Sequence, residues 1–221
     1  MRAWGNGLLG FAVVVLIVGV PTAYYRASYE HAKRFRTVTD GKFYRSGQFT
    51  TSGLKQTIER YGIKTVINLQ HENTDPLMPQ GWMGKPKFLE SEICQALGVR
   101  YIQLDVTELI PANEEGTRRP VGIDQFLKIC DDPTIYPVLI HCMAGLHRTG
   151  RLTAIYRMEY EGRTNAEAAY EAKANGYGDF KCTDVDEYFV QYVRDYKKGL
   201  RFPAPPPQWD SAEMLLKGAD K

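Results

Sequence analysis

The sequence predicts an α/β fold in which a central, mostly parallel β-sheet is flanked by helices. Short apolar runs alternate along the chain with longer segments whose apolar residues recur every three or four positions, the pattern of strands alternating with helices. One run, "YPVLIH" (136–141), is too short for a helix and indicates the central strand. With 221 residues, of which 43% are hydrophobic and 24% charged, the chain can bury the core of one catalytic domain.

Each further element follows from a local pattern. Gly62 and Gly98 stop two amphipathic segments, and Thr164 with Glu167 forms a capping box that begins another helix. Strands are expected at 41–47, 64–69, 99–105 and 136–141, and helices at 52–62, 86–98, 121–130, 148–162, from Thr164 onward, and 184–198.

The cysteines and the charge balance exclude several classes of protein. The four cysteines lack the paired spacing of zinc ligands and are too few for a disulfide framework in a chain of this length; they are Cys94, Cys130, Cys142 and Cys182. Cys94 and Cys130 lie beside the apolar stripes of their helices, so we expect them to be core thiols. A net charge of +2 without a basic block argues against a nucleic-acid partner.

The N-terminal stretch differs from the rest of the chain. Leu8–Tyr25 carries no charge and is long enough to cross a bilayer, which predicts an N-terminal transmembrane helix within a membrane anchor at 1–28. A cleaved signal peptide is the alternative, although "PTA" (21–23) is a poor cleavage site. The expected localisation is therefore single-pass membrane, and the basic residues after the span favour a cytoplasmic catalytic domain.

The remaining organisation follows from the polar connector and the prolines. A catalytic domain is expected at 37–200, followed by a Pro-rich C-terminal tail at 201–221. The run "RFPAPPPQWD" (201–210) is incompatible with regular helix or sheet. We expect it to pack on the surface or to be disordered, with a ligand for a proline-recognition domain as the alternative.

The segment "HCMAGLHRTG" (141–150) joins the central strand to a helix. Its small residues Ala144 and Gly145 let the chain curl so that successive backbone N–H groups point inward. The N-terminus of the following helix adds its positive dipole at the same point. A phosphate group is therefore expected to bind the loop residues Met143, Ala144, Gly145, Leu146, His147 and Arg148.

The side chains of this segment suit nucleophilic chemistry on phosphorus. Cys142 is expected to be a thiolate nucleophile, because cations and a helix N-terminus favour that form. Arg148 offers a planar fork that matches two phosphoryl oxygens. Thr149 places a hydroxyl where it can stabilise the departing thiolate, and His141 is expected to orient the loop. A merely structural buried cysteine is the alternative, which the complete strand, loop and helix pattern disfavours.

With this segment the chain resembles the cysteine-dependent protein tyrosine and dual-specificity phosphatases. The likeness includes "FYRSGQ" (43–48) and "GIKTVINLQ" (62–70), extends to about Tyr196, and is strongest to the small atypical dual-specificity-like phosphatases of bacteria, plants and fungi. It implies a dual-specificity phosphatase-like fold and a two-step mechanism. In that mechanism Cys142 attacks phosphorus, a carboxylic acid protonates the leaving oxygen, and water hydrolyses the phospho-cysteine. The resemblance implies no metal and no other cofactor.

The resemblance also implies a general acid on the loop after the third strand. Asp105 in "YIQLDVTE" (101–108) best fits that position, and Glu108 is the first alternative. Glu114 and Glu115 are further alternatives, because the segment from Asp105 to the cysteine is longer than in most relatives. Each could instead be a solvated loop carboxylate.

Several functions remain open at this point. A protein phosphatase for phosphotyrosine, with phosphoserine and phosphothreonine as further substrates, comes first, so a phosphorylated protein is the expected partner beside the membrane. A phosphoinositide or inositol phosphate phosphatase is favoured by the anchor but disfavoured by the loop, where relatives with that activity carry lysines and this chain has Met143 and Leu146. A catalytically weak phosphate-binding adaptor is the third possibility, and a rhodanese-type sulfurtransferase fits the Arg-Thr-Gly ending less well.

Overall fold

A mixed β-sheet forms the centre of the structure. The computed structural model describes residues 2–26, 32–81, 84–108, 110, 113–176 and 192–211. In these ranges the strands are β1 (Arg36–Thr39), β2 (Phe43–Gly47), β3 (Thr65–Asn68), β4 (Arg100–Gln103), β5 (Val138–Cys142) and β6 (Trp209–Asp210), in the order β1-β2-β5-β3-β4-β6. The inner strands are parallel and each edge strand is antiparallel to its neighbour. The prediction of a central, mostly parallel sheet is confirmed.

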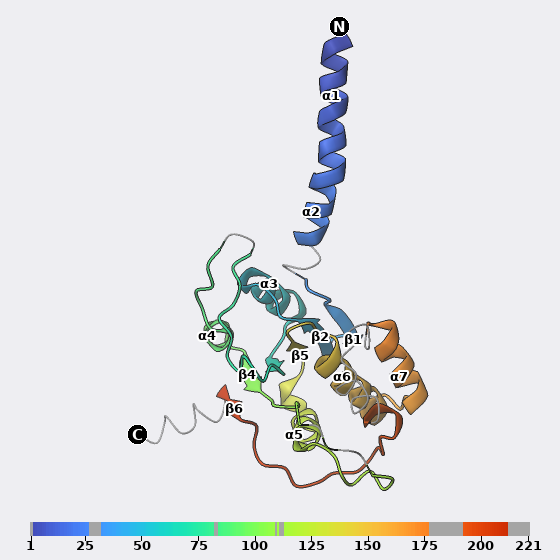
Figure 1. Cartoon of the computed structure of the whole chain (residues 1–221). Helices are drawn as coiled ribbons and strands as arrows, with labels where there is room; N and C mark the ends of the chain where they lie inside the picture. Colours follow the sequence, from blue (N-terminus) through green and yellow to red (C-terminus); the bar gives the residue numbers. More distant parts are fainter. Residues whose placement is uncertain are drawn as a thin grey trace.

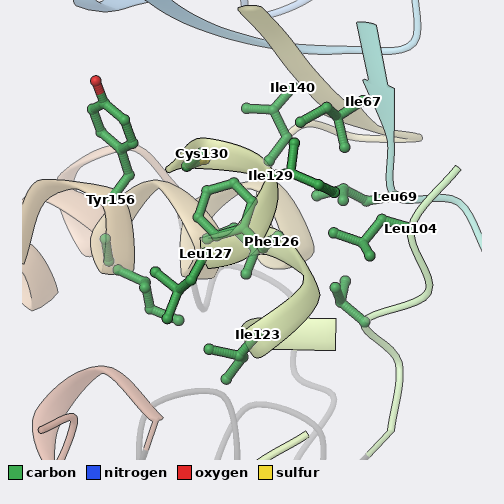
Figure 2. Packing of buried hydrophobic residues seen from close by; sticks show 14 of the residues in the cluster. Ile67, Leu69, Leu104, Ile123, Phe126, Leu127, Ile129, Cys130, Ile140 and Tyr156 are labelled. Atoms are coloured by element: carbon green, nitrogen blue, oxygen red, sulfur yellow. The ribbon is translucent and has the colours of Figure 1, made fainter. Parts of the chain in front are cut away.

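Helices cover both faces of this sheet (Figure 1). They are α3 (Thr51–Tyr61), α4 (Glu90–Ala96), α5 (Val121–Cys130), the 3₁₀-helix η3 (Pro133–Ile135), α6 (His147–Tyr160) and α7 (Asn165–Ala174). Helices α3 and α4 share a buried apolar cluster with Val66 and Leu139 on one face. Helices α5, α6 and α7 share the other cluster, and Figure 2 shows its packing with Phe126 of α5 and Ile140 of β5. The flanking helices that the sequence predicts are therefore present on both faces.

Local signals set most helix boundaries. The Thr50 side chain accepts a hydrogen bond from the backbone of Gly53 at the start of α3, and Gly62 ends this helix with a φ of 61°. Thr164 and Glu167 form both hydrogen bonds of the predicted capping box at the start of α7. These are interactions between residues a few positions apart, which is why the sequence pattern could predict them.

Two predicted helices differ from the structure or fall outside it. The helix expected at 86–98 begins only at Glu90, because Leu89 is still extended and forms an antiparallel bridge to Leu77. The helix expected at 184–198 lies mostly outside the described residues.

The thiols away from the loop behave as core residues. Cys94 and Cys130 are both buried and unpaired, and burial raises the pKa of each. Their assignment as core thiols is confirmed, whereas Cys182 lies outside the described residues.

The apolar N-terminal stretch does not form the predicted membrane span. It is divided into α1 (Arg2–Val14), a π-helical segment η1 (Val15–Gly19) and α2 (Val20–Tyr25). None of the helices in the described ranges combines the length and the apolar character that a crossing needs. The predictions of a transmembrane helix, a single-pass membrane localisation and a membrane partner are therefore wrong.

Part of the proline-rich run joins the sheet. Trp209 and Asp210 form β6 and pair with β4, contrary to the expectation that 201–210 contains no strand. The Arg100 side chain donates two hydrogen bonds to the Asp210 carboxylate, at 3.0 and 2.5 Å, and Gln125 of α5 donates to the carbonyl oxygen of Pro206 at 2.9 Å. These long-range bonds fix the run against the body of the protein.

The loop after β5 makes a close backbone contact with the end of β2. Gly145 has a φ of 72°, and a Cβ there would lie 2.4 Å from the backbone nitrogen of Gly47 and 2.6 Å from the carbonyl carbon of Ser46. Only glycine fits this position without a shift of the backbone. The contact holds the loop against the neighbouring strand.

We expect Gly145→Ala to lower the free energy of unfolding more than Gly41→Ala does. Both glycines have positive φ angles, 72° and 66°, which cost an alanine about 1–2 kcal/mol. Nothing lies within 4 Å of a Cβ at Gly41, whereas at Gly145 the backbone must also move, which costs about 1–3 kcal/mol more. Urea unfolding of the two full-chain variants measures the difference. Equal destabilisation would contradict the close contact.

Candidate active site

The predicted phosphate-binding loop lies at the edge of the sheet where the parallel strands end. Gly47 of β2 pairs in register with Cys142 of β5, and Asn68 of β3 pairs with His141. Because side chains alternate between the two faces of a strand, Cys142 lies on the face covered by α5 and α6, and His141 lies on the face covered by α4. Ligand sites of open α/β sheets are found at this carboxyl edge.

Three successive carbonyl groups of the loop are bonded away from its centre. The carbonyl oxygen of Met143 accepts from the backbone N–H of Gln48 at 3.3 Å. That of Ala144 accepts from Arg34 Nη1 at 3.0 Å, and that of Gly145 accepts from Arg45 Nη2 at 2.8 Å. In a trans peptide the C=O and the following N–H point in opposite directions, so these bonds direct the next three N–H groups toward the inside of the loop.

Cys142 lies inside this ring of amides. Its side chain is almost fully buried, and the backbone N–H of Gly145 donates to Sγ at 3.2 Å. Helix α6 begins five residues later at His147, so its N-terminal turn faces the loop. The predicted nucleophile and the predicted phosphate-binding backbone are thus adjacent.

A buried arginine brings positive charge to the same place. Arg45 of β2 is 2% exposed and lies on the same face of the sheet as Cys142. Burial lowers the pKa of Arg45 to about 10, Arg36 acts in the same direction, and the negative charge of Cys142 opposes both. The carboxylate of Glu171 also opposes this lowering. Arg45 is therefore cationic at neutral pH, and its hydrogen-bond acceptor is a neutral carbonyl group, so its charge can act on an anion in the loop.

Arg148 binds a carboxylate outside the loop. Its Nη1 lies 3.0 Å from Glu72 Oε2 and also donates to the carbonyl oxygen of Leu69 at 3.3 Å. Partial burial raises the pKa of Glu72, but hydrogen bonds from its own backbone N–H and from Arg148 outweigh this effect and leave the pKa below its ordinary value. The pair is solvent-accessible, which makes it weak and exchangeable.

His141 has a buried acidic neighbour. Its Nε2 lies 3.0 Å from Glu90 Oε1, with both side chains almost fully buried. The hydroxyl of Tyr101 donates to the other oxygen of Glu90 at 3.4 Å, and to the carbonyl oxygen of Thr74 at 2.8 Å. This geometry suits the expected role of His141 in fixing the base of the loop.

The other predicted loop residues differ in exposure. Leu146 is buried, His147 and Ala144 are half-buried, and Met143 is exposed. Thr149 is fully buried in the first turn of α6, and its Oγ1 has no hydrogen-bond partner among the described residues. A buried hydroxyl without a partner is costly, so this one is available to a group that arrives during the reaction.

The structure separates the candidate general acids. Asp105 is half-buried two residues after the end of β4, and its Oδ1 accepts from the backbone N–H and the hydroxyl of Thr107 at 2.9 and 2.6 Å. Arg151 of α6 donates to the carbonyl oxygen of Val106, which ties this segment to the helix that follows the loop. Asp105 is thus carried by a segment that packs beside the site.

The alternative acids have other positions. Glu108 is exposed, and its carboxylate accepts from the backbone N–H of Val121 at the start of α5 at 3.4 Å. Glu114 and Glu115 are exposed in a turn that Asn113 closes through its hydrogen bond from the N–H of Arg118. Within the described ranges, no hydrogen bond or ion pair joins any of these three side chains, or that of Asp105, to the loop.

The sequence analysis did not identify several residues that shape the site. Arg45 lies within "FYRSGQ" (43–48), a stretch that predicted a strand and carried part of the family resemblance but was given no role in the site. Arg34, Glu72 and Glu90 reach the site from segments far away in sequence, and Glu72 is 76 residues from Arg148. No local pattern predicts such partners.

Comparisons with known proteins agree with this geometry. A family model described as "PTP-NADK: DSP-PTPase phosphatase fused to NAD+ Kinase" matches residues 20–189. The "Putative tyrosine-protein phosphatase OCA1" of Mycosarcoma maydis is 27% identical over 156 residues, which cover 70% of this chain and 87% of that protein.

Solved structures share the fold. The core catalytic domain of the PP-IP phosphatase SIW14 from S. cerevisiae has a TM-score of 0.55 at 19% identity, covering 77% of this chain and 89% of that one. TpbA of P. aeruginosa has a TM-score of 0.50 at 20% identity, covering 76% and 96%. Because the family model spans most of the chain, the protein belongs to the DSP-PTPase phosphatase family and is a cysteine-dependent phosphomonoesterase.

Proposed function

We propose that the protein removes phosphate from phosphotyrosine in proteins, and from phosphoserine and phosphothreonine, through a phospho-cysteine on Cys142. The observation that carries this proposal is the ring of inward-directed amides around Cys142, fixed by the outward bonds of Met143, Ala144 and Gly145. Such a ring stabilises the oxygens of a phosphoryl group on which negative charge is spread. The tyrosine-phosphatase name of the OCA1 relative supports a protein substrate.

In the first step Cys142 Sγ attacks phosphorus. The S–P bond forms while the P–O bond to the substrate breaks, and the leaving oxygen takes a proton. We assign that proton to Asp105, because its segment is tied to α6 through Arg151 and because Glu108 is engaged at the start of α5. The short hydrogen bonds from Thr107 hold the Asp105 carboxyl group in a defined orientation.

In the second step water attacks the phospho-cysteine. Asp105, now a carboxylate, takes a proton from the water, the O–P bond forms, and the S–P bond breaks with its electron pair on Sγ. We assign stabilisation of the departing thiolate to the hydroxyl of Thr149, which is buried at the start of α6 and has no hydrogen-bond partner among the described residues. Inorganic phosphate and the free thiolate remain.

We assign Arg148 the role of a mobile clamp. Its bond to Glu72 is solvent-accessible, so a phosphoryl group can take the place of that carboxylate. The guanidinium then matches two phosphoryl oxygens at once and can follow them as they flatten in the transition state. Glu72 keeps the side chain ordered until the substrate arrives.

The catalytic unit proposed here is residues 37–200, with the preceding segment 32–36 and the strand β6 packed against it. A phosphoinositide or inositol phosphate substrate is the competing proposal. The name of SIW14, a PP-IP phosphatase of the same fold, supports it. A membrane anchor no longer favours this substrate class, because no helix in the described ranges is long and apolar enough to cross a bilayer. A turnover panel of phosphopeptides, phosphoinositides and inositol phosphates separates the two substrate classes.

We expect Cys142→Ser to abolish turnover while inorganic phosphate still binds, because the amides survive and the nucleophile does not. Phosphate release from a phosphotyrosine peptide and calorimetric titration with inorganic phosphate measure the two properties. Cys130→Ser makes the same chemical change at a buried thiol outside the site, and this variant should retain activity. Turnover by the Cys142 variant would exclude the covalent mechanism, whereas a natural protein that binds phosphate without any turnover would be the adaptor.

We expect Asp105→Asn to slow substrates with poor leaving groups most. General acid catalysis contributes about 10² to 10⁴ in rate, and a nitrophenolate leaving group needs little protonation. The variant should therefore lose far more activity on a phosphoserine peptide or phenyl phosphate than on nitrophenyl phosphate. Glu108→Gln is the matched control and should treat all substrates alike. A selective loss in the Glu108 variant instead would transfer the acid role to that residue.

A further inference from the structure

We propose that Lys33, in the segment before β1, is a phosphate-binding residue of the active site whose ammonium group contacts the phosphoryl group bound at Cys142. This inference rests on the proposed phosphatase function. From its sequence this segment is a polar connector outside the catalytic domain expected at 37–200, and nothing in its composition distinguishes it.

The segment is firmly packed against the loop. The carbonyl oxygen of Lys33 accepts a hydrogen bond from the backbone N–H of Gly47 at 2.8 Å. Arg34 donates to the carbonyl oxygen of Ala144 at 3.0 Å and has a φ of 50°, which non-glycine residues rarely adopt. Such a conformation persists only where the surrounding contacts enforce it.

An aromatic cluster holds the segment on its other side. The ring of Phe35 lies 4.7 Å from that of Tyr61 and 5.6 Å from that of Tyr44, between ring centroids. Aromatic pairs at such distances stabilise a fold beyond their buried area. Lys33 is thus placed between a fixed aromatic anchor and the phosphate-binding loop.

The side chain of Lys33 lies along the reactive edge of the sheet. A Cβ at Gly47 would lie 3.0 Å from both Cγ and Cδ of Lys33, and 3.1 Å from the carbonyl carbon of Ala144. The aliphatic part of the lysine therefore passes between the end of β2 and the loop. Gly47 is the residue that pairs in register with Cys142, so the lysine crosses the sheet edge one strand away from the sulfur.

The charges around Lys33 also connect it to the nucleophile. Burial and the charge of Arg34 lower the pKa of Lys33, whereas the negative charge of Cys142 acts in the opposite direction. In the part of the chain that the structure describes, no carboxylate lies within ion-pair distance of Lys33. A half-buried ammonium without a carboxylate partner can bind an anion without first giving up an ion pair.

The guanidinium groups of Arg34 and Arg45 are already bonded to the loop backbone. Arg34 and Arg45 bond the carbonyl groups of Ala144 and Gly145. The loop side chains Met143 and Leu146 are apolar, which led the sequence analysis to predict a weakly basic pocket. Lys33 supplies from outside the loop the positive charge that these positions lack.

The test uses Lys33→Met, Lys33→Arg and Lys128→Met in the full chain. Methionine keeps most of the aliphatic stem of lysine and removes its charge. Lys128 is the control, because it is an exposed lysine near the end of α5, and α5 leads to the start of β5 at the opposite edge of the sheet. The measurements are the competitive inhibition constant of inorganic phosphate, KM and kcat on nitrophenyl phosphate, and the midpoint of thermal unfolding.

We expect Lys33→Met to raise the phosphate inhibition constant and KM about tenfold to a hundredfold, the worth of a hydrogen bond to a charged group. The thermal midpoint should stay close to that of the natural protein. Lys33→Arg should keep the phosphate inhibition constant within about threefold of that of the natural protein, because arginine keeps the positive charge. Lys128→Met should change neither constant.

Two results would overturn the inference. One is a Lys33→Met variant with unchanged phosphate inhibition. The other is a loss of activity in Lys33→Met that is accompanied by a lower thermal midpoint and that Lys33→Arg shows as well. That result would mean that Lys33 has only a structural role. Either leaves the proposed function intact as long as Cys142→Ser is inactive, whereas turnover by Cys142→Ser removes the proposed function whatever Lys33 does.

Discussion

The rest of the site depends on the outward hydrogen bonds of three successive loop carbonyls. They fix the peptide planes of Met143, Ala144 and Gly145 before any phosphate is present. A loop that had to reorient its amides during binding would lose affinity to that ordering, whereas fixed dipoles need no reorganisation when charge develops. The close contact of Gly145 with β2 serves the same arrangement, since it brings the carbonyl oxygen within reach of Arg45.

The charge distribution of the site depends on whether the hydrogen-bond partner of each basic side chain is neutral or negatively charged. Arg45 is buried but bonds a carbonyl oxygen, so its charge is not neutralised by that bond. Burying a cation is unfavourable, and a nearby anion relieves part of that cost; for Arg45 the charges of Cys142 and Glu171 act in this direction. Glu72 and Glu90 balance only Arg148 and His141, at the rim and beneath the loop.

The sequence predicted features that depend on neighbours along the chain. The parallel inner strands, the helix caps and the strand, loop and helix around Cys142 arise from patterns within about fifteen residues. The edge strands β1 and β6 were not predicted, because runs of four and two residues without alternation carry too little signal. The transmembrane prediction was wrong: it rested on hydropathy, which measures composition alone, and none of the helices in the described ranges is both long and apolar enough to cross a bilayer.

Within the site, too, the sequence predicted residues that are close together along the chain and missed contacts between residues that are far apart in it. Cys142 and Arg148 share one loop, so their spacing was readable, whereas Arg34 and Ala144 are separated by 110 positions and Glu72 and Arg148 by 76. The distribution of roles has a physical reason. In the proposed mechanism the amides must not move, and long-range bonds to the neighbouring carbonyls fix them. Arg148 must follow oxygens as they flatten, and it is held by a solvent-accessible ion pair to Glu72 and by a 3.3 Å bond to the carbonyl oxygen of Leu69. In the proposed mechanism, a rigid cradle and one exchangeable guanidinium favour the transition state over the ground state, which is the requirement for catalysis.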